Sequence, residues 1–233
     1  MCGGLLLLFV QLSLRKNASS VRYAENYFFA PNILTQCQHG AIILVVTQCQ
    51  NEMRCGMKIV VLMASPNTDG STSVLADSFA RGAEEGGHSV EIVDVCKLDI
   101  APCTGCVACG YEGDCVQHDD NELIRRKLLS CDMVVFATPL YYYGMSAQLK
   151  TVVDRFCAYN SSINRRHLKS ALLTVAWNSQ DWTFEALEAH YKTLVRYINF
   201  EDMGMVLGYG CGTPSMTMAG KYPEMAYKLG RSL

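Results

Sequence analysis

Four cysteines of this 233-residue chain, Cys103, Cys106, Cys109 and Cys115, lie in one short segment with the spacing C-x2-C-x2-C-x5-C. Such a segment could hold a metal cluster, form disulfides or carry unrelated thiols. A compact C-x2-C-x2-C run is typical of segments that wrap a 4Fe–4S cubane, with Cys115 then completing the same cluster. Structural zinc usually joins two C-x2-C pairs through a longer spacer, so zinc fits this spacing less well.

The composition bears on compartment and partners. Half of the residues are hydrophobic and the net charge is −2. The sequence contains no run of basic residues. Nucleic acid is therefore not an expected partner, and no apolar stretch reaches the roughly 18 residues of a membrane span. Twelve cysteines in a chain of this length are expected to be thiols or ligands in a reducing cytoplasm. We expect the isolated Cys131, Cys157 and Cys211 to be small core residues.

The hydrophobic pattern changes at residue 57. Residues 1–56 show no sustained period, whereas "MKIVVLM" from Met57 is the continuous apolar run of a buried strand. We predict an N-terminal extension of uncertain structure at 1–56 and a functional domain at 57–233. A misassigned translation start would also explain the extension, and a native peptide from residues 1–56 would exclude that explanation.

Strands and helices alternate from Met57 onward. Strands are expected at 58–64, 89–95, 133–138, 171–176 and about 203–207. Helices are expected from about 71, from 119 or 120, around 149–156, after 181 and over 222–229. This alternation predicts a doubly wound α/β domain, a five-stranded parallel sheet with helices on both faces. Asp119 and Glu122 have the spacing of a capping box at the second helix.

The loop after the first strand, "SPNTDGSTS" at 65–73, joins a buried strand to a helix N-terminus. Unpaired N–H groups and the positive end of the helix dipole favour a phosphate there. The loop lacks the Lys of a nucleoside-triphosphate loop and the glycine pattern of a dinucleotide fold. Its hydroxyls suit a single terminal phosphate, although an ordinary helix cap has the same residues.

The loop after the third strand, "ATPLYYYGMSAQLKTVVDRF" at 137–156, places three tyrosines where a ligand would bind. Aromatic rings and neighbouring amides suit a flat aromatic ligand. A buried aromatic cluster or a subunit contact would use the same residues.

Together, "SPNTDGSTS" and "TPLYYYGMSAQLKTVVDR" resemble the NAD(P)H-dependent FMN reductase family, over residues 57 to about 215. The resemblance implies a flavodoxin-like sheet of order 2-1-3-4-5, with FMN as cofactor. It implies that the FMN phosphate contacts Ser65, Asn67, Ser71, Thr72 and Ser73. It implies that the flavin ring is lined by Pro139, Leu140, Tyr141, Tyr142, Tyr143, Gly144 and Met145. The family often has Arg where this chain has Asn67, which puts the strength of FMN binding in question.

The cysteine segment is similar to that of the iron–sulfur flavoprotein branch, which carries a compact cysteine motif between the second strand and second helix. The following "HDDNEL" also resembles that branch. The resemblance implies a 4Fe–4S cluster on the four cysteines, but inherited thiols without metal are the alternative.

Three functions follow as hypotheses. In the first, NAD(P)H reduces FMN, which passes electrons to a quinone or a nitroaromatic compound. In the second, a cluster takes electrons from ferredoxin and feeds FMN. The third is a cysteine-rich metal-binding or interaction module without flavin. Because a flavin carries redox chemistry itself, we predict no acid–base residue. The family resemblance further implies a homodimer or larger homo-oligomer.

Overall fold

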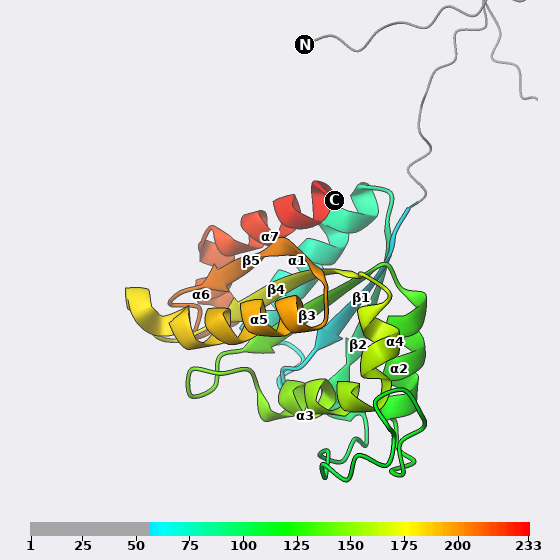
Figure 1. The fold of residues 1–233 in the computed structure, drawn as a ribbon. Coiled ribbons are helices and arrows are strands. Elements are labelled where there is room, and N and C mark those ends of the chain that lie inside the picture. Colours follow the sequence, from blue (N-terminus) through cyan, green and yellow to red (C-terminus); the bar gives the residue numbers. More distant parts are fainter. Residues whose placement is uncertain (1–55) are drawn as a thin grey trace, which may run out of the picture. The chain divides into compact units, whose positions relative to one another are not determined.

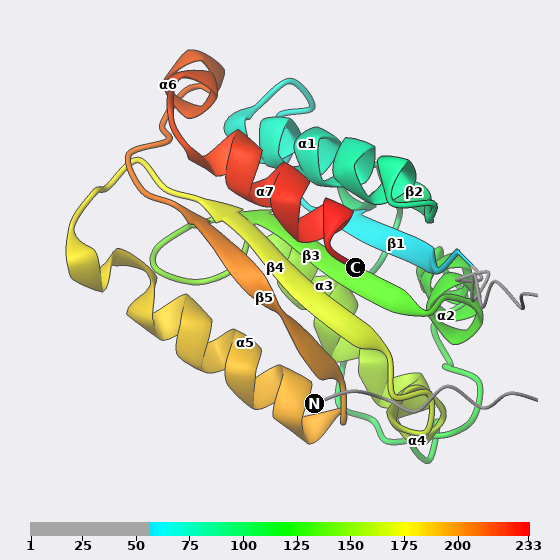
Figure 2. The same cartoon turned by 90° about the horizontal axis from the view of Figure 1, so that it is seen from above.

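The computed structural model describes residues 56–233, so the predicted extension lies outside the described residues, apart from Gly56. Five parallel strands form the sheet, in the predicted order β2-β1-β3-β4-β5. They are β1 (Lys58–Met63), β2 (Ser89–Asp94), β3 (Met133–Pro139), β4 (Lys169–Val175) and β5 (Glu201–Gly208). Each contains most of a predicted strand, and the five follow one another across the sheet in Figure 2.

Helices connect the strands. They are α1 (Ser71–Glu85), α2 (Asn121–Ser130), α3 (Ala147–Arg155), α4 (Asn160–Asn164), α5 (Glu185–Tyr197), α6 (Pro214–Ala219) and α7 (Tyr222–Arg231), with short 3-10 turns η1 (Val95–Lys97), η2 (Phe156–Tyr159) and η3 (Asp181–Phe184). The short α4 and α6 were not predicted, because five or six residues are too few for a helical period to show. No helix among residues 56–233 is long and apolar enough to cross a membrane.

The sheet separates two apolar cores. Alternate residues of the central strands point to opposite faces, so that Ile59 and Val61 belong to one core and Val60 and Leu62 to the other. Helices α1 and α7 cover the first face, and α2, α3 and α5 cover the second (Figures 1 and 2). The apolar stripe predicted for α3, at Leu149, Val152, Val153 and Phe156, is buried as expected.

Helices α1 and α7 cross at very short range. A Cβ atom on Gly82 would lie 2.1 Å from the carbonyl oxygen of Tyr227, and one on Gly230 would lie 2.2 Å from that of Phe79. The two backbones can therefore approach this closely only because both positions are glycine. This packing holds the C-terminal helix against the helix that follows the predicted phosphate loop.

Candidate functional site

The two loops singled out in the sequence leave the sheet side by side. Strands β1 and β3 are parallel neighbours, and the Ala64 N–H donates to the Ala137 carbonyl oxygen at 2.8 Å, where both strands end. Loop 65–70 then leads into α1, and loop 140–146 leads into α3. Because helices on opposite faces follow these adjacent strands, the loops lie at the topological switch point, where doubly wound sheets commonly bind ligands.

The first loop is ordered by its own polar side chains. The Ser65 hydroxyl donates to the Asn67 carbonyl oxygen at 3.1 Å, and Asn67 Oδ1 accepts the N–H of Asp69 at 3.2 Å. The Ser73 hydroxyl donates to the Thr68 carbonyl oxygen at 2.6 Å. Three of the five side chains predicted to contact phosphate therefore also shape the loop that would hold it.

The N-terminus of α1 is open to an anion. Its N-cap is Gly70, which offers no side-chain cap, and its first turn carries no acidic residue. Ser71 and Thr72 are buried there, and the Ser71 hydroxyl has no hydrogen-bond partner among the described residues. A buried hydroxyl without a partner is unfavourable, so its presence at a helix N-terminus indicates a place for a ligand oxygen.

The tyrosines of the second loop form a tight hairpin. Tyr141 and Gly144 exchange backbone hydrogen bonds of 3.0 and 3.1 Å, and the two residues between them have φ of 46° and 66°. Positive φ at both central positions is the geometry of a type I′ turn. It leaves the Tyr142 side chain fully exposed, while the Tyr143 ring lies 5.2 Å from that of Trp182. The tyrosines are thus not a buried cluster, which was one alternative.

Ser146 joins the two loops, although the sequence reasoning did not single it out. Its hydroxyl donates to the Ala64 carbonyl oxygen at 2.8 Å and accepts the Leu149 N–H at 3.3 Å, which caps α3. Its own N–H donates to Thr138 Oγ1 at 2.9 Å. A serine before an apolar helical stripe predicts a cap, but nothing local predicts the contact with Ala64.

The four motif cysteines line one pocket, together with Arg155 and Cys157. Left-handed backbone at Gly105, Val107, Gly110 and Tyr111 turns the segment repeatedly. Cys106 is exposed, and the Ala108 N–H directed at its sulfur, followed by a hydrogen bond from Thr104, lowers the pKa of its thiol. Such N–H···S contacts stabilise the thiolate, which is the form that binds metals.

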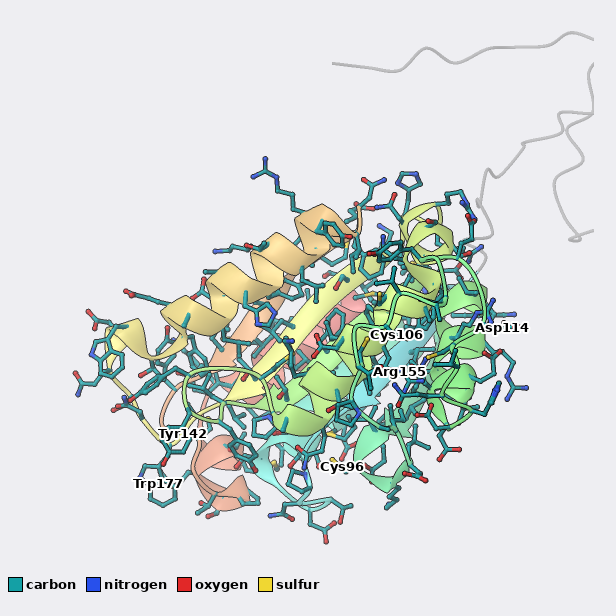
Figure 3. All side chains as sticks on the ribbon, turned by 60° about the horizontal axis from the view of Figure 1, so that its bottom comes forward. Cys96, Cys106, Asp114, Tyr142, Arg155 and Trp177 are labelled. Atoms are coloured by element: carbon teal, nitrogen blue, oxygen red, sulfur yellow. The ribbon has the colours of Figure 1, made fainter. Side chains whose placement is uncertain are left out.

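Arg155 closes the base of the cysteine loop. Its guanidinium is buried and donates to the Ala101 carbonyl oxygen at 2.7 Å and to that of Gln117 at 3.2 Å. It also forms a two-pronged ion pair with Asp119, with distances of 2.6 and 3.1 Å. Both ends of the loop are therefore fixed to the last residue of α3, and Cys106 and Arg155 lie close together in Figure 3.

This ion pair replaces the predicted capping box. Asp119 accepts the N–H groups of Asn121 and Ala101, at 3.0 and 3.1 Å, and its carboxylate also binds Arg155. Burial alone would raise the pKa of Asp119, but the hydrogen bonds from Arg155, Asn121 and Ala101 outweigh it and lower that pKa. The prediction that Asp119 and Glu122 form a capping box was wrong because a buried arginine competes for the carboxylate.

The prediction that Cys157 is an isolated core residue was also wrong. It lies on η2, is half-buried, and lines the same pocket as the motif cysteines. Cys131 and Cys211 are buried, as predicted. Within residues 56–233, no three Cys, His, Asp or Glu side chains are close enough together to hold a metal ion.

A five-stranded parallel sheet of order 2-1-3-4-5 with helices on both faces defines a flavodoxin-like fold. The family model for NADPH-dependent FMN reductases matches residues 57–202. This chain belongs to that family, as the two loop motifs predicted.

Relatives of known name share the central part of the chain. It is 38% identical over 103 residues to an iron–sulfur flavoprotein of Archaeoglobus fulgidus, which is 44% of this chain and 47% of that protein. It is 31% identical over 99 residues to an iron–sulfur flavoprotein of Methanosarcina thermophila, 42% of this chain and 52% of that protein. The chain thus spans about half the length of these relatives.

Solved structures confirm the fold. The NAD(P)H:quinone oxidoreductase from Methanothermobacter marburgensis matches with a TM-score of 0.63 and 18% identity, over 76% of this chain and 96% of that one. The Trp repressor binding protein from Bacillus subtilis matches with a TM-score of 0.54 and 21% identity, over 74% of this chain and 99% of that one.

Proposed function

We propose that this chain is an FMN-dependent oxidoreductase that takes electrons from NAD(P)H and passes them to a small molecule such as a quinone or a nitroaromatic compound. The observation that carries the proposal is the buried, unpartnered hydroxyl of Ser71 at the open N-terminus of α1. Family membership supports FMN as the ligand that completes it.

The residues present fit an FMN. The N–H groups at the start of α1, with the hydroxyls of Ser71 and Thr72, would hold its phosphate without a cation. The peptide segment 139–145 would line its ring, with the tyrosine hairpin as one wall. Bound FMN would supply hydride and single-electron chemistry. Nothing in this arrangement requires a protein acid or base.

An FMN titration of the full chain, followed by flavin fluorescence, tests the proposal. Replacing Ser71→Asp together with Thr72→Asp puts carboxylates where the phosphate binds, so FMN affinity should fall strongly by like-charge repulsion. Riboflavin, which lacks the phosphate, provides the matched ligand control. If the wild-type chain neither retains nor takes up FMN, the proposal is wrong and a flavin-free cysteine module becomes the better interpretation.

The electron donor and acceptor are tested with the FMN-loaded chain. NADPH or NADH oxidation should depend on an added quinone or nitroaromatic compound. Reduction by ferredoxin, but by neither nicotinamide, would favour an electron-transfer protein instead. Because all eight cysteines of the described residues are free thiols, we place the protein in the reducing cytoplasm.

A second candidate includes a 4Fe–4S cluster on Cys103, Cys106, Cys109 and Cys115. All four thiols line one pocket, and two relatives are named iron–sulfur flavoproteins. A cubane takes one ligand on each of four iron atoms, so its thiolates need not converge on a single point. The chemistry of these donors therefore fits a cluster better than a single metal ion.

Iron and acid-labile sulfide assays on anaerobically prepared protein decide between cluster and thiols. Replacing any one motif cysteine by alanine should lose iron while FMN binding is kept, because the two sites share no residue. Cys131→Ala is the control, since Cys131 is buried outside the pocket. If the wild-type protein contains neither iron nor sulfide, and all four thiols can be alkylated, the cluster candidate is wrong. The protein would then be an FMN reductase whose motif cysteines bind no metal.

A further inference from the structure

Cys157 is a fifth thiol in the cysteine pocket, and it is not part of the C-x2-C-x2-C-x5-C motif. We propose that Cys109 and Cys157 form a disulfide when the pocket holds no iron, which makes Cys157 a site of oxidative modification. This inference goes beyond the proposed function, because forming the disulfide requires neither FMN nor a cluster.

The contact between these two residues carries the inference. The Cys109 thiol donates to the carbonyl oxygen of Cys157 itself, at a distance of 3.8 Å. Cys157, Cys109 and Cys103 line the same pocket, where burial and then the two neighbouring thiols raise the pKa of the Cys157 thiol to about 11. A disulfide requires two cysteines whose backbones lie close together and whose side chains converge. Cys109 is the motif cysteine whose thiol reaches the Cys157 backbone.

Neighbouring contacts hold the two residues together. Cys109 begins a turn in which its carbonyl oxygen accepts the Gly113 N–H at 2.7 Å. The tip of this turn is docked on α4, which directly follows η2: the Ser161 N–H donates to the Tyr111 carbonyl oxygen at 3.1 Å, and Arg165 pairs with Glu112. The Cys109 segment is thus fixed against the segment that carries Cys157.

The oxidant is a small disulfide such as glutathione disulfide. One protein thiolate attacks a sulfur of that disulfide, releases one glutathione thiolate and forms a mixed disulfide. The other protein thiolate then attacks the protein sulfur of the mixed disulfide and releases the second glutathione. The two cysteines lose two electrons and two protons, and the oxidant becomes two glutathione thiols.

The disulfide would remove Cys109 from the metal-binding set. Three motif cysteines would then remain, which is too few for a cluster with four thiolate ligands. Oxidation of Cys157 and iron binding at the pocket should therefore exclude one another. Both residues are half-buried, so a small disulfide can reach the pocket.

Peptide mapping tests the proposal on the full, iron-free chain treated with glutathione disulfide and then blocked with an alkylating agent. Trypsin would leave Cys109 in peptide 98–125 and Cys157 in peptide 156–165. Mass spectrometry should find these two peptides joined, with the loss of two hydrogen atoms, as the main product that contains Cys157. Fragmentation of the joined pair should place the link at Cys109.

Matched variants complete the test. The joined pair should be absent from Cys157→Ala and lost from Cys109→Ser. It should be unchanged in Cys131→Ala, because Cys131 is buried and does not line the cysteine pocket. No joined pair in the wild-type chain, or a link that persists through Cys103 in Cys109→Ser, would overturn the proposal.

A separate arm uses protein reconstituted with iron and sulfide. If iron is taken up, the joined pair should be suppressed, and its undiminished formation would contradict the mutual exclusion. If no iron is taken up, the cluster candidate fails, while the mapping of the iron-free chain still decides the disulfide.

Discussion

Four buried side-chain atoms among the described residues have no hydrogen-bond partner: Ser71 Oγ, Arg155 Nε, Thr174 Oγ1 and Thr183 Oγ1. An unpartnered buried donor costs about 1–3 kcal/mol, so a fold keeps one mainly where a ligand or a shifted neighbour can complete it. Ser71 lies at the phosphate loop, and Arg155 lies beside the Cys115 thiol. Two of the four atoms thus lie at the two candidate sites.

Replacing Ser71→Ala should weaken FMN binding by about 10- to 150-fold, because it removes one charge-assisted hydrogen bond worth about 1.5–3 kcal/mol. Fluorescence titration with FMN measures the loss, and riboflavin affinity should not change. Ser78→Ala is the control, since that hydroxyl lies on the same helix and donates to the Val74 carbonyl oxygen at 2.7 Å. An equal loss for FMN and riboflavin would rule out a phosphate contact.

Replacing Arg155→Met should destabilise the domain by about 3–5 kcal/mol at neutral pH, because it leaves the Asp119 carboxylate without its partner. The pKa of Asp119 is lowered in the folded state, so the ion pair stabilises the fold above the ordinary aspartate pKa of about 3.9. The difference in unfolding free energy between wild type and Arg155→Met should shrink as the pH falls through the folded-state pKa of Asp119. Urea unfolding at a series of pH values measures it.

Arg125→Met is the matched control for that experiment. Arg125 pairs with Asp114 at 2.8 Å, but the Asp114 side chain is 86% exposed. An exposed pair contributes only about 0–1 kcal/mol, so this variant should unfold almost like the wild type. A similar deficit in both variants would mean that the Arg155 contacts add nothing beyond packing.

At the scale of elements, α3 connects the two sites. Its N-cap, Ser146, contacts the residue before the phosphate loop, and its last residue, Arg155, closes the cysteine loop. Nine residues at about 1.5 Å each give a rod of roughly 13 Å between them. One short helix, buried along one face, thus contacts both loops.

The crossing of α1 and α7 gives a stability prediction. Gly230→Ala places a Cβ atom 2.2 Å from the Phe79 carbonyl oxygen, so the helices must separate. The cost should be about 1–3 kcal/mol, typical of overpacking. Thermal unfolding should show a lower midpoint for Gly230→Ala. Gly220→Ala is the control: its added Cβ would have its nearest contact at 3.4 Å, so it should lose less than about 0.5 kcal/mol, as a neutral surface substitution does. An unchanged midpoint for Gly230→Ala would contradict this close packing.

For the whole molecule, exposed aromatic rings gather at the sheet edge that carries the two loops. We call Tyr141, Tyr142, Tyr143, Trp177 and Trp182 the aromatic rim, and all five are exposed. Tyr142 and Trp177 reach outward at the same end of the molecule in Figure 3. Exposed aromatic surface beside a ligand site commonly marks a subunit interface. This observation supports the proposal of a homodimer.

Replacing Tyr142→Asp should therefore shift the FMN-loaded protein toward monomer. The Tyr142 side chain is fully exposed in the single protomer, so the substitution should not disturb folding. Light scattering at micromolar concentration measures the mass, and Tyr197→Asp, an exposed tyrosine of α5, should leave it unchanged. A wild-type monomer with FMN bound would contradict the dimer.

Local sequence determined much of this protein. The continuous apolar run Ile59–Met63 predicted β1, because a strand buried on both faces needs apolar side chains at every position. The alternation of strand and helix patterns predicted the parallel sheet as a whole. Hydroxyls after the first strand and tyrosines after the third predicted a ligand site at these two loops, and the structure places both loops at one sheet edge. The spacing of Cys103, Cys106, Cys109 and Cys115 predicted that the four cysteines act together at one site, and all four line one pocket.

Only the tertiary structure decided which distant residues complete those sites. Ser146 contacts Ala64 across 82 residues, Arg155 contacts Asp119 across 36, and Cys109 contacts Cys157 across 48. Helical and strand periods report which face of an element is buried, but not which side chain it meets there. Those partners are set by the order of the strands and the packing of α3, so Cys157 looked isolated in sequence and lies in the pocket.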